Sequence, residues 1–99
     1  MKILTRPQMR IAEIGKELKI LNVTGTKGVE MPCHFSTKEA IIIVLKGEVL
    51  IKLEDKEIYL KPNQSLIIPA SEPHTLSVKE DFAANVIMAI DSEIKFINN

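Results

Sequence analysis

The chain has 99 residues, of which 45% are hydrophobic and 26% are charged, a composition typical of globular proteins. Thirteen Lys and Arg residues balance thirteen Asp and Glu residues, and this zero formal charge argues against nucleic acid as a partner. The single cysteine excludes an intramolecular disulfide, and the longest apolar run, Ala40 to Leu45, is too short to cross a membrane. We therefore expect one soluble, cytoplasmic domain over residues 1–99, with neither nucleic acid nor a membrane as a partner.

The N-terminal segment, residues 1–17, allows two interpretations. Apolar alternation from Ile3 to Ile14 favours an extra strand or a dimerisation element. Apolar residues at helical spacing predict instead a short helix over Gln8 to Leu18, although Gly15 interrupts it and no N-cap precedes it. At most one short N-terminal helix is therefore expected.

Beyond this segment, turn residues divide the chain into short stretches rich in Ile, Val and Leu, a pattern typical of successive strands. The clearest stretch alternates with period 2, placing Val49, Ile51 and Leu53 on one face. Strands without intervening helices cannot form βαβ units, so the sheet must be antiparallel, and closure into a small jelly-roll barrel removes its edges. The fold class is therefore all-β. The predicted strands are residues 17–24, 39–45, 47–53, 56–60, 65–68, 75–79 and 83–90.

The order of Gly28, His34, Gly47, Pro69 and His74 resembles the two motifs of the cupin family, whose members are small β-barrels. The resemblance extends over about residues 18–90, and the motifs themselves lie within residues 28–78. It implies a single cupin-type jelly-roll β-barrel of short antiparallel strands.

In the first motif, five residues separate Gly28 from His34, which matches the motif's first histidine. Ser36 stands in the place of the second histidine, Ala40 in that of the glutamate, and Gly47 matches the closing glycine. Metal-dependent cupins use these positions, together with a third histidine in the second motif, to hold a divalent ion.

In the second motif, Asn63 takes the place of the first glycine, and Pro69 matches the proline. Ser71 replaces the second glycine, His74 matches the histidine, and Val78 replaces the asparagine. Of the four metal ligands that the resemblance implies, the sequence thus keeps only the two histidines, so the metal site is incomplete.

Strand alternation predicts where the two histidines point. It places Glu30, Pro32 and Ser36 on the same face as His34, and directs Cys33 to the opposite face. Inward positions of the following strands then complete an apolar pocket with two imidazoles and a hydroxyl. The predicted ligand-pocket residues are His34, Ser36, Ala40, Ile42, His74, Leu76 and Met88.

This pocket favours a small-molecule-binding barrel that needs no cofactor, with His34 and His74 as polar anchors for a small organic molecule or a sugar-like acid. An imidazole suits the anchoring of a carboxylate or carbonyl, and it suits proton transfer equally well. The alternative is therefore an enzyme with His34 and His74 as its catalytic residues. It would be a metal-dependent oxygenase or isomerase that holds Fe, Mn, Ni or Zn weakly, or a metal-free isomerase or epimerase.

Two further expectations remain open. One hypothesis is that the histidines are hydrogen-bonded residues with no role beyond structure, because a fold does not determine a function. The resemblance also implies a homodimer, since small cupins commonly pair through their N-terminal strands.

Overall fold

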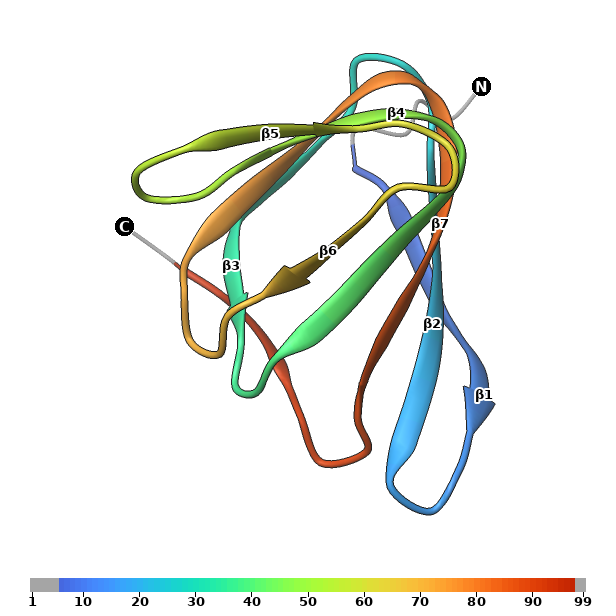
Figure 1. Ribbon diagram of the computed structural model, residues 1–99, viewed down its shortest axis with the longest axis vertical. Coiled ribbons are helices and arrows are strands. Elements are labelled where there is room, and N and C mark those ends of the chain that lie inside the picture. Colours follow the sequence, from blue (N-terminus) through green and yellow to red (C-terminus); the bar gives the residue numbers. More distant parts are fainter. Residues whose placement is uncertain (1–5, 98–99) are drawn as a thin grey trace.

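The computed structural model describes residues 6–97, which form eight strands and no helix (Figure 1). The strands are β1 (Gln8–Ile14), β2 (Leu18–Gly25), β3 (Glu30–Ser36), β4 (Ala40–Lys52), β5 (Glu57–Leu60), β6 (Ser65–Ile68), β7 (His74–Ala89) and β8 (Ile94–Phe96). All strand pairs are antiparallel, as the sequence predicts. Within residues 6–97, no helix is long and apolar enough to cross a membrane.

The N-terminal segment forms strand β1, so the alternative of a helix over Gln8 to Leu18 is wrong. Backbone pairing with β2, which begins at Gln8 opposite Thr24, outweighs the weak helical spacing of the apolar residues. The N–H of Gly15 donates to the carbonyl oxygen of Leu18 at 2.7 Å and closes the turn between the two strands. Residues 1–5 lie outside the described residues.

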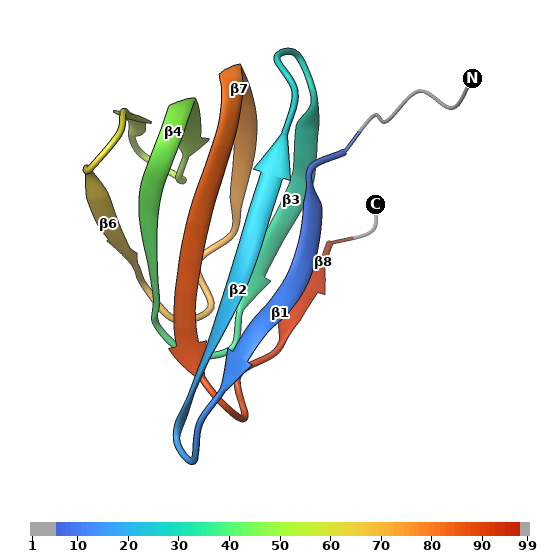
Figure 2. The ribbon, with the colours of Figure 1, turned by 90° about the vertical axis from the view of Figure 1, so that its right-hand side faces the viewer.

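Strands β4 and β7 pair with each other along most of their length and join the two layers of the barrel (Figure 1). At one end, residues 40–44 and 84–88 lie between β6 and β2. At the other end, residues 49–52 and 75–78 lie between β5 and β3. The edge strands β1 and β8 lie on the same side of the molecule (Figure 2).

Gly47 bends β4 without ending it. The sequence predicts separate strands on either side of this glycine, over residues 39–45 and 47–53, and on either side of the charged positions 79–81, over residues 75–79 and 83–90. Each pair of predicted strands is instead one continuous strand. Gly47 has a φ of 80°, and the register against β7 shifts on both sides of it, which is a β-bulge. A Cβ at this position would collide with the backbone of Asp81 and Phe82. The close approach of two backbones therefore requires glycine here.

The bulge also changes which side chains of β4 face the core. Before Gly47 the buried side chains include Ile42 and Val44, and after it they include Val49 and Ile51. The inward positions thus change from even to odd numbers along the strand. Both halves contribute to one core between the two layers.

Candidate functional site

The two histidines of the chain lie side by side inside the barrel. His34 of β3 and His74 of β7 are directly opposite each other in the antiparallel pair, with ring centroids 4.2 Å apart and ring planes inclined by 60°. Each residue is only 5% exposed. Phe96 of β8 packs beside His34, with a centroid separation of 5.4 Å. The fold thus joins the matching histidines of the two sequence motifs in one site.

A bulge in β3 turns His34 toward the interior. The register of β3 against β7 shifts between Met31 and His34, and both of these residues are buried. Glu30 and Pro32 are exposed, so the prediction that they share the face of His34 is wrong. Simple alternation fails because the extra residue of a bulge reverses the parity of the positions beyond it. Ser36, two positions after His34, is buried as predicted.

Backbone carbonyl groups hold both imidazole rings. His34 Nδ1 donates to the carbonyl oxygen of Pro32 at 2.7 Å, and His74 Nδ1 donates to that of Glu72 at 3.0 Å. A carbonyl oxygen only accepts hydrogen bonds, so the proton of each neutral ring resides on Nδ1. Each Nε2 then carries a free lone pair, and neither forms a hydrogen bond with a described residue.

Burial keeps both rings neutral. Desolvation lowers the pKa of His34 from its ordinary value of 6.5 to about 4, against the opposing effect of the hydrogen bond to Pro32. Desolvation also lowers the pKa of His74, whereas its hydrogen bond to the backbone of Glu72 and the charge of Glu72 oppose this change. At neutral pH the site therefore presents two uncharged imidazoles that act as hydrogen-bond acceptors through Nε2.

The two rings line a cavity of about 40 Å³. Six of the seven predicted pocket residues line it, and Met88 does not. Met88 is instead buried in a cluster with Leu21 and Ala40. The described residues around the cavity are Met9, Leu21, Val23, Met31, His34, Ser36, Ala40, Ile42, Ile68, His74, Leu76, Val86 and Ile94.

Several lining residues were not predicted. Met31 enters through the bulge in β3, and Met9 and Ile94 come from the edge strands β1 and β8. The apolar alternation of the N-terminal segment is the one sequence signal that could have indicated Met9. Met9 is 40% exposed, which places it where the cavity meets the surface.

The donor atoms of the cavity do not fit a resident catalytic divalent metal. Such ions usually have three protein ligands, and the cavity supplies two imidazoles. The other two family positions hold the hydroxyl of Ser36, a weak neutral ligand, and Ala40, which has no donor. Among residues 6–97, no group of three His, Cys, Asp or Glu side chains is placed to hold a metal ion.

Four positions of the family motifs have the left-handed backbone conformation that favours glycine. Gly28 and Gly47 have φ angles of 96° and 80°, and Asn63 and Ser71, which replace motif glycines, have φ angles of 71° and 63°. Within residues 6–97, these four positions account for all positive φ angles. The N–H of Ser71 also donates to the carbonyl oxygen of Ser36 at 2.7 Å, which fixes the turn before His74 to the end of β3.

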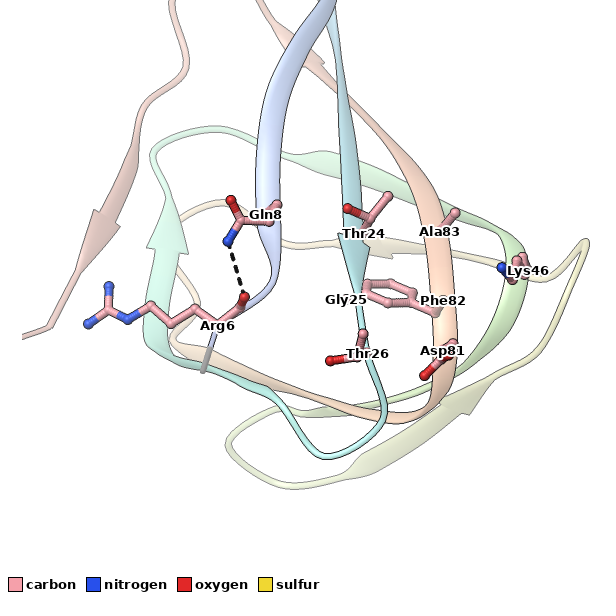
Figure 3. Close-up of a pocket in the computed structure, with 9 residues that line it drawn as sticks. All are labelled: Arg6, Gln8, Thr24, Gly25, Thr26, Lys46, Asp81, Phe82 and Ala83. Atoms are coloured by element: carbon pink, nitrogen blue, oxygen red, sulfur yellow. Dashed lines mark hydrogen bonds between the residues drawn. The ribbon is translucent and has the colours of Figure 1, made fainter. Parts of the chain in front are cut away.

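Two wider surface hollows differ from this cavity in chemistry. The first, of about 270 Å³, contains neither histidine, and in Figure 3 the guanidinium of Arg6 points away from Lys46 and Asp81. Its carboxylate, that of Asp81, already accepts the N–H of Lys27 at 2.8 Å. The second, of about 450 Å³, lies on the outer side of His74 and includes half-buried Cys33, which does not line the inner cavity.

Comparison with known proteins agrees with this geometry. The family model of the cupin domain matches residues 23–90, whereas no curated protein matches the chain. A cupin superfamily protein from Desulfitobacterium hafniense DCB-2 superposes with a TM-score of 0.79 at 21% identity, over 92% of this chain and 84% of that one. KdgF from a Halomonas species gives 0.78 at 19% identity, over 90% and 84%.

The DMSP lyase DddQ from Ruegeria pomeroyi DSS-3 gives a TM-score of 0.82 at 21% identity, covering 92% of this chain and 51% of the lyase. Identities this low establish a shared fold and do not transfer an activity. The family model, in contrast, spans more than half of the chain and both histidines. The chain therefore belongs to the cupin family.

Proposed function

We propose that this cupin barrel binds a small molecule without a resident metal, and that His34 and His74 anchor the ligand. The observation that carries the proposal is a pair of imidazoles that line an apolar cavity and whose Nδ1 protons are occupied by backbone carbonyls, which leaves Nε2 as the free acceptor of each ring. A mostly apolar wall with a few convergent polar groups is the usual plan of a small-molecule site.

The size of the cavity limits how such a ligand binds. Pockets that enclose a whole drug-sized molecule measure roughly 300–1,000 Å³. The cavity, at about 40 Å³, holds only a small end of a ligand. The rest of the ligand then lies at the mouth, beside the partly exposed side chain of Met9.

Binding is favoured over metal-free isomerase or epimerase chemistry by the basicity of the histidines. A general base is most effective when its pKa lies near the working pH. Burial lowers the pKa of His34 to about 4, which makes it a weak base at neutral pH. The structural neighbours also differ in what they are named for, a DMSP lyase and KdgF among them, so the barrel alone favours no reaction.

Metal analysis combined with a ligand screen tests the proposal. The protein is incubated with iron, manganese, nickel and zinc, desalted and analysed, and its melting temperature is then measured with a broad panel of metabolites. We expect no stoichiometric metal and at least one compound that raises the melting temperature of the wild type but not of the His34→Ala, His74→Ala variant. One metal per chain that this variant loses would overturn the metal-free proposal. An absence of stabilisation across the panel would overturn ligand binding.

We also propose that the chain forms a homodimer through its first strands. Strand β1 pairs only with β2 in the described sheet, so its outer edge offers backbone hydrogen-bonding groups to another strand. Ile11, Ile14 and Leu18 in the β1–β2 hairpin are 56 to 58% exposed, and a second copy would cover them. Light scattering at micromolar concentration should give twice the mass of one chain, whereas a monomer mass would contradict the proposal.

A further inference from the structure

The tautomers of the two histidines restrict the chemistry of the ligand. Because each Nδ1–H is used by a backbone carbonyl, the one ring nitrogen that each of these lining histidines has left for a ligand, Nε2, is an acceptor. A carboxylate or carbonyl oxygen offers lone pairs alone and would meet lone pairs on both imidazoles. To bind such a group, at least one ring must either take up a proton or release its bond to Pro32 or Glu72. The expectation of a carboxylate, carbonyl or sugar-like acid as ligand therefore conflicts with this arrangement.

The cavity wall restricts the charge of the ligand in the same way. None of the described lining residues carries a formal charge, and Ser36 is the only polar one besides the histidines. An ammonium group could donate to both Nε2 atoms. Without a carboxylate in the wall, however, it would lose its hydration with no compensating charge. A neutral donor avoids this cost.

Extending the proposed function, on which this inference rests, we propose that the cavity binds the hydroxyl-bearing end of a neutral ligand, such as a diol or polyol. Two hydroxyl groups donate to Nε2 of His34 and Nε2 of His74. The hydroxyl of Ser36, 5% exposed and on the same wall, both donates and accepts, so it completes the hydrogen bonds of the ligand oxygens. The carbon atoms of that end contact Leu76 and Ile42.

Three probes of equal chain length test the ligand class: propane-1,2-diol, propionate and propylammonium. Each is titrated at pH 7.5 into protein labelled with ¹⁵N, and the ring nitrogens of both histidines are followed by NMR. A hydrogen bond donated to an unprotonated Nε2 moves its resonance to lower frequency. We expect saturable shifts of both Nε2 signals with the diol and none with the two ions.

Matched variants locate the effect. Propane-1,2-diol should raise the melting temperature of the wild type, and His34→Leu and His74→Leu should each lose this increase. Met88→Leu changes a buried side chain outside the cavity and should retain it. Even where a leucine variant does not fold, the shifts of the Nε2 resonances in the wild type still test whether the diol binds at the histidines.

The outcomes separate this inference from the proposed function. Saturable shifts with propionate or propylammonium but not with the diol would overturn the neutral-donor assignment, and ligand binding at the histidines would stand. An absence of shifts with all three probes would also overturn the neutral-donor assignment. The metabolite panel described above would then decide the proposed function by itself.

Discussion

Two regions of the molecule differ in how far they match the cupin motifs: the four motif positions with positive φ angles, and the cavity around the histidine pair. At the turns, two of the glycines are replaced, yet Asn63 and Ser71 still have φ angles of 71° and 63°. In the cavity, the two histidines lie together, but Ser36 and Ala40 stand at the two positions where the motif of metal-dependent cupins has further ligands. The positive φ angles thus follow the pattern of the motifs, whereas the side chains of the cavity match it only in part.

This difference has a physical cause. A turn with positive φ sets the direction of the chain, so a change in its backbone would displace every strand that follows. A side chain in the cavity affects mainly its neighbours, so its chemistry can differ without displacing a strand. The barrel fold therefore does not depend on a complete set of metal ligands at these positions.

The largest effect should come from Gly47→Ala, which tests the positive φ angle at the bulge of β4. The added Cβ meets the carbonyl of Asp81 and the Cα of Phe82, and the residue must also keep a φ of 80°. We expect a loss of about 3 kcal/mol or more in the free energy of unfolding, measured by urea denaturation.

Gly28→Ala is the matched control for this prediction. Gly28 has a φ of 96°, but a Cβ there would meet no atom within 4 Å. The cost should therefore be that of the left-handed backbone alone, roughly 1 kcal/mol. Equal losses in the two variants would show that the backbone contact at Gly47 is unimportant.

The next prediction concerns a third histidine in the cavity, which should allow it to bind zinc. Ser36→His should place a third imidazole beside His34 and His74, at the position of the motif's second histidine, and three histidines suffice for a zinc site. With free zinc at 100 times the dissociation constant, the variant should gain about 2.7 kcal/mol in stability.

Its control is Ser36→His combined with His74→Leu, which should lose the response to zinc. Equal stabilisation of the wild type by zinc would mean that the original pair already holds a metal, and the contrast between turns and cavity would fail.

The sequence predicts the strands better than their irregularities. Alternation along residues 47–53 correctly places Val49 and Ile51 in the core. The bulges at Gly47 and before His34 depend on how β4 and β3 pair with β7, a strand distant in the sequence. The register of pairing with a distant strand cannot be read from a local sequence pattern. The lengths of β4 and β7, and the burial of the Met31 side chain, could therefore not be predicted.

Acidification should have a smaller effect, through the histidines of the cavity. The pKa of His34 is about 4 in the folded protein against 6.5 ordinarily, so between these values the unfolded chain binds a proton that the folded chain does not. The stability is complete above pH 6.5 and is lost as the pH falls toward 4. At pH 5 we expect a loss of about 2 kcal/mol from His34, and the lowered pKa of His74 acts in the same direction.

Urea unfolding at pH 7 and pH 5 measures this loss. A His34→Leu, His74→Leu variant provides the control, because it should lose much less stability over the same interval. A wild type that is equally stable at both pH values would contradict the burial of neutral imidazoles.

The cavity was predictable in outline only. Family spacing and alternation indicate the positions of His34, Ser36 and His74, and the structure places all three around one cavity. Which ring nitrogen carries the proton depends on hydrogen bonds to the carbonyls of Pro32 and Glu72. The positions of these carbonyls depend on backbone geometry, which the spacing of residues in the sequence does not reveal. The acceptor character of the site, on which the ligand class rests, therefore required the structure.

The smallest predicted effect on stability concerns the two turns in which a residue other than glycine has a positive φ angle. Ser71→Gly removes the strain of a left-handed serine, roughly 1 kcal/mol, but glycine also gains freedom in the unfolded chain that offsets about half of it. We expect a net stabilisation of about 0.5 kcal/mol, and less for Asn63→Gly because asparagine tolerates this conformation better. Both residues are exposed, so neither change opens a cavity. Thermal unfolding of the two variants measures the ranking. A destabilised Ser71→Gly would show that the serine side chain, and not the backbone alone, holds this turn against β3.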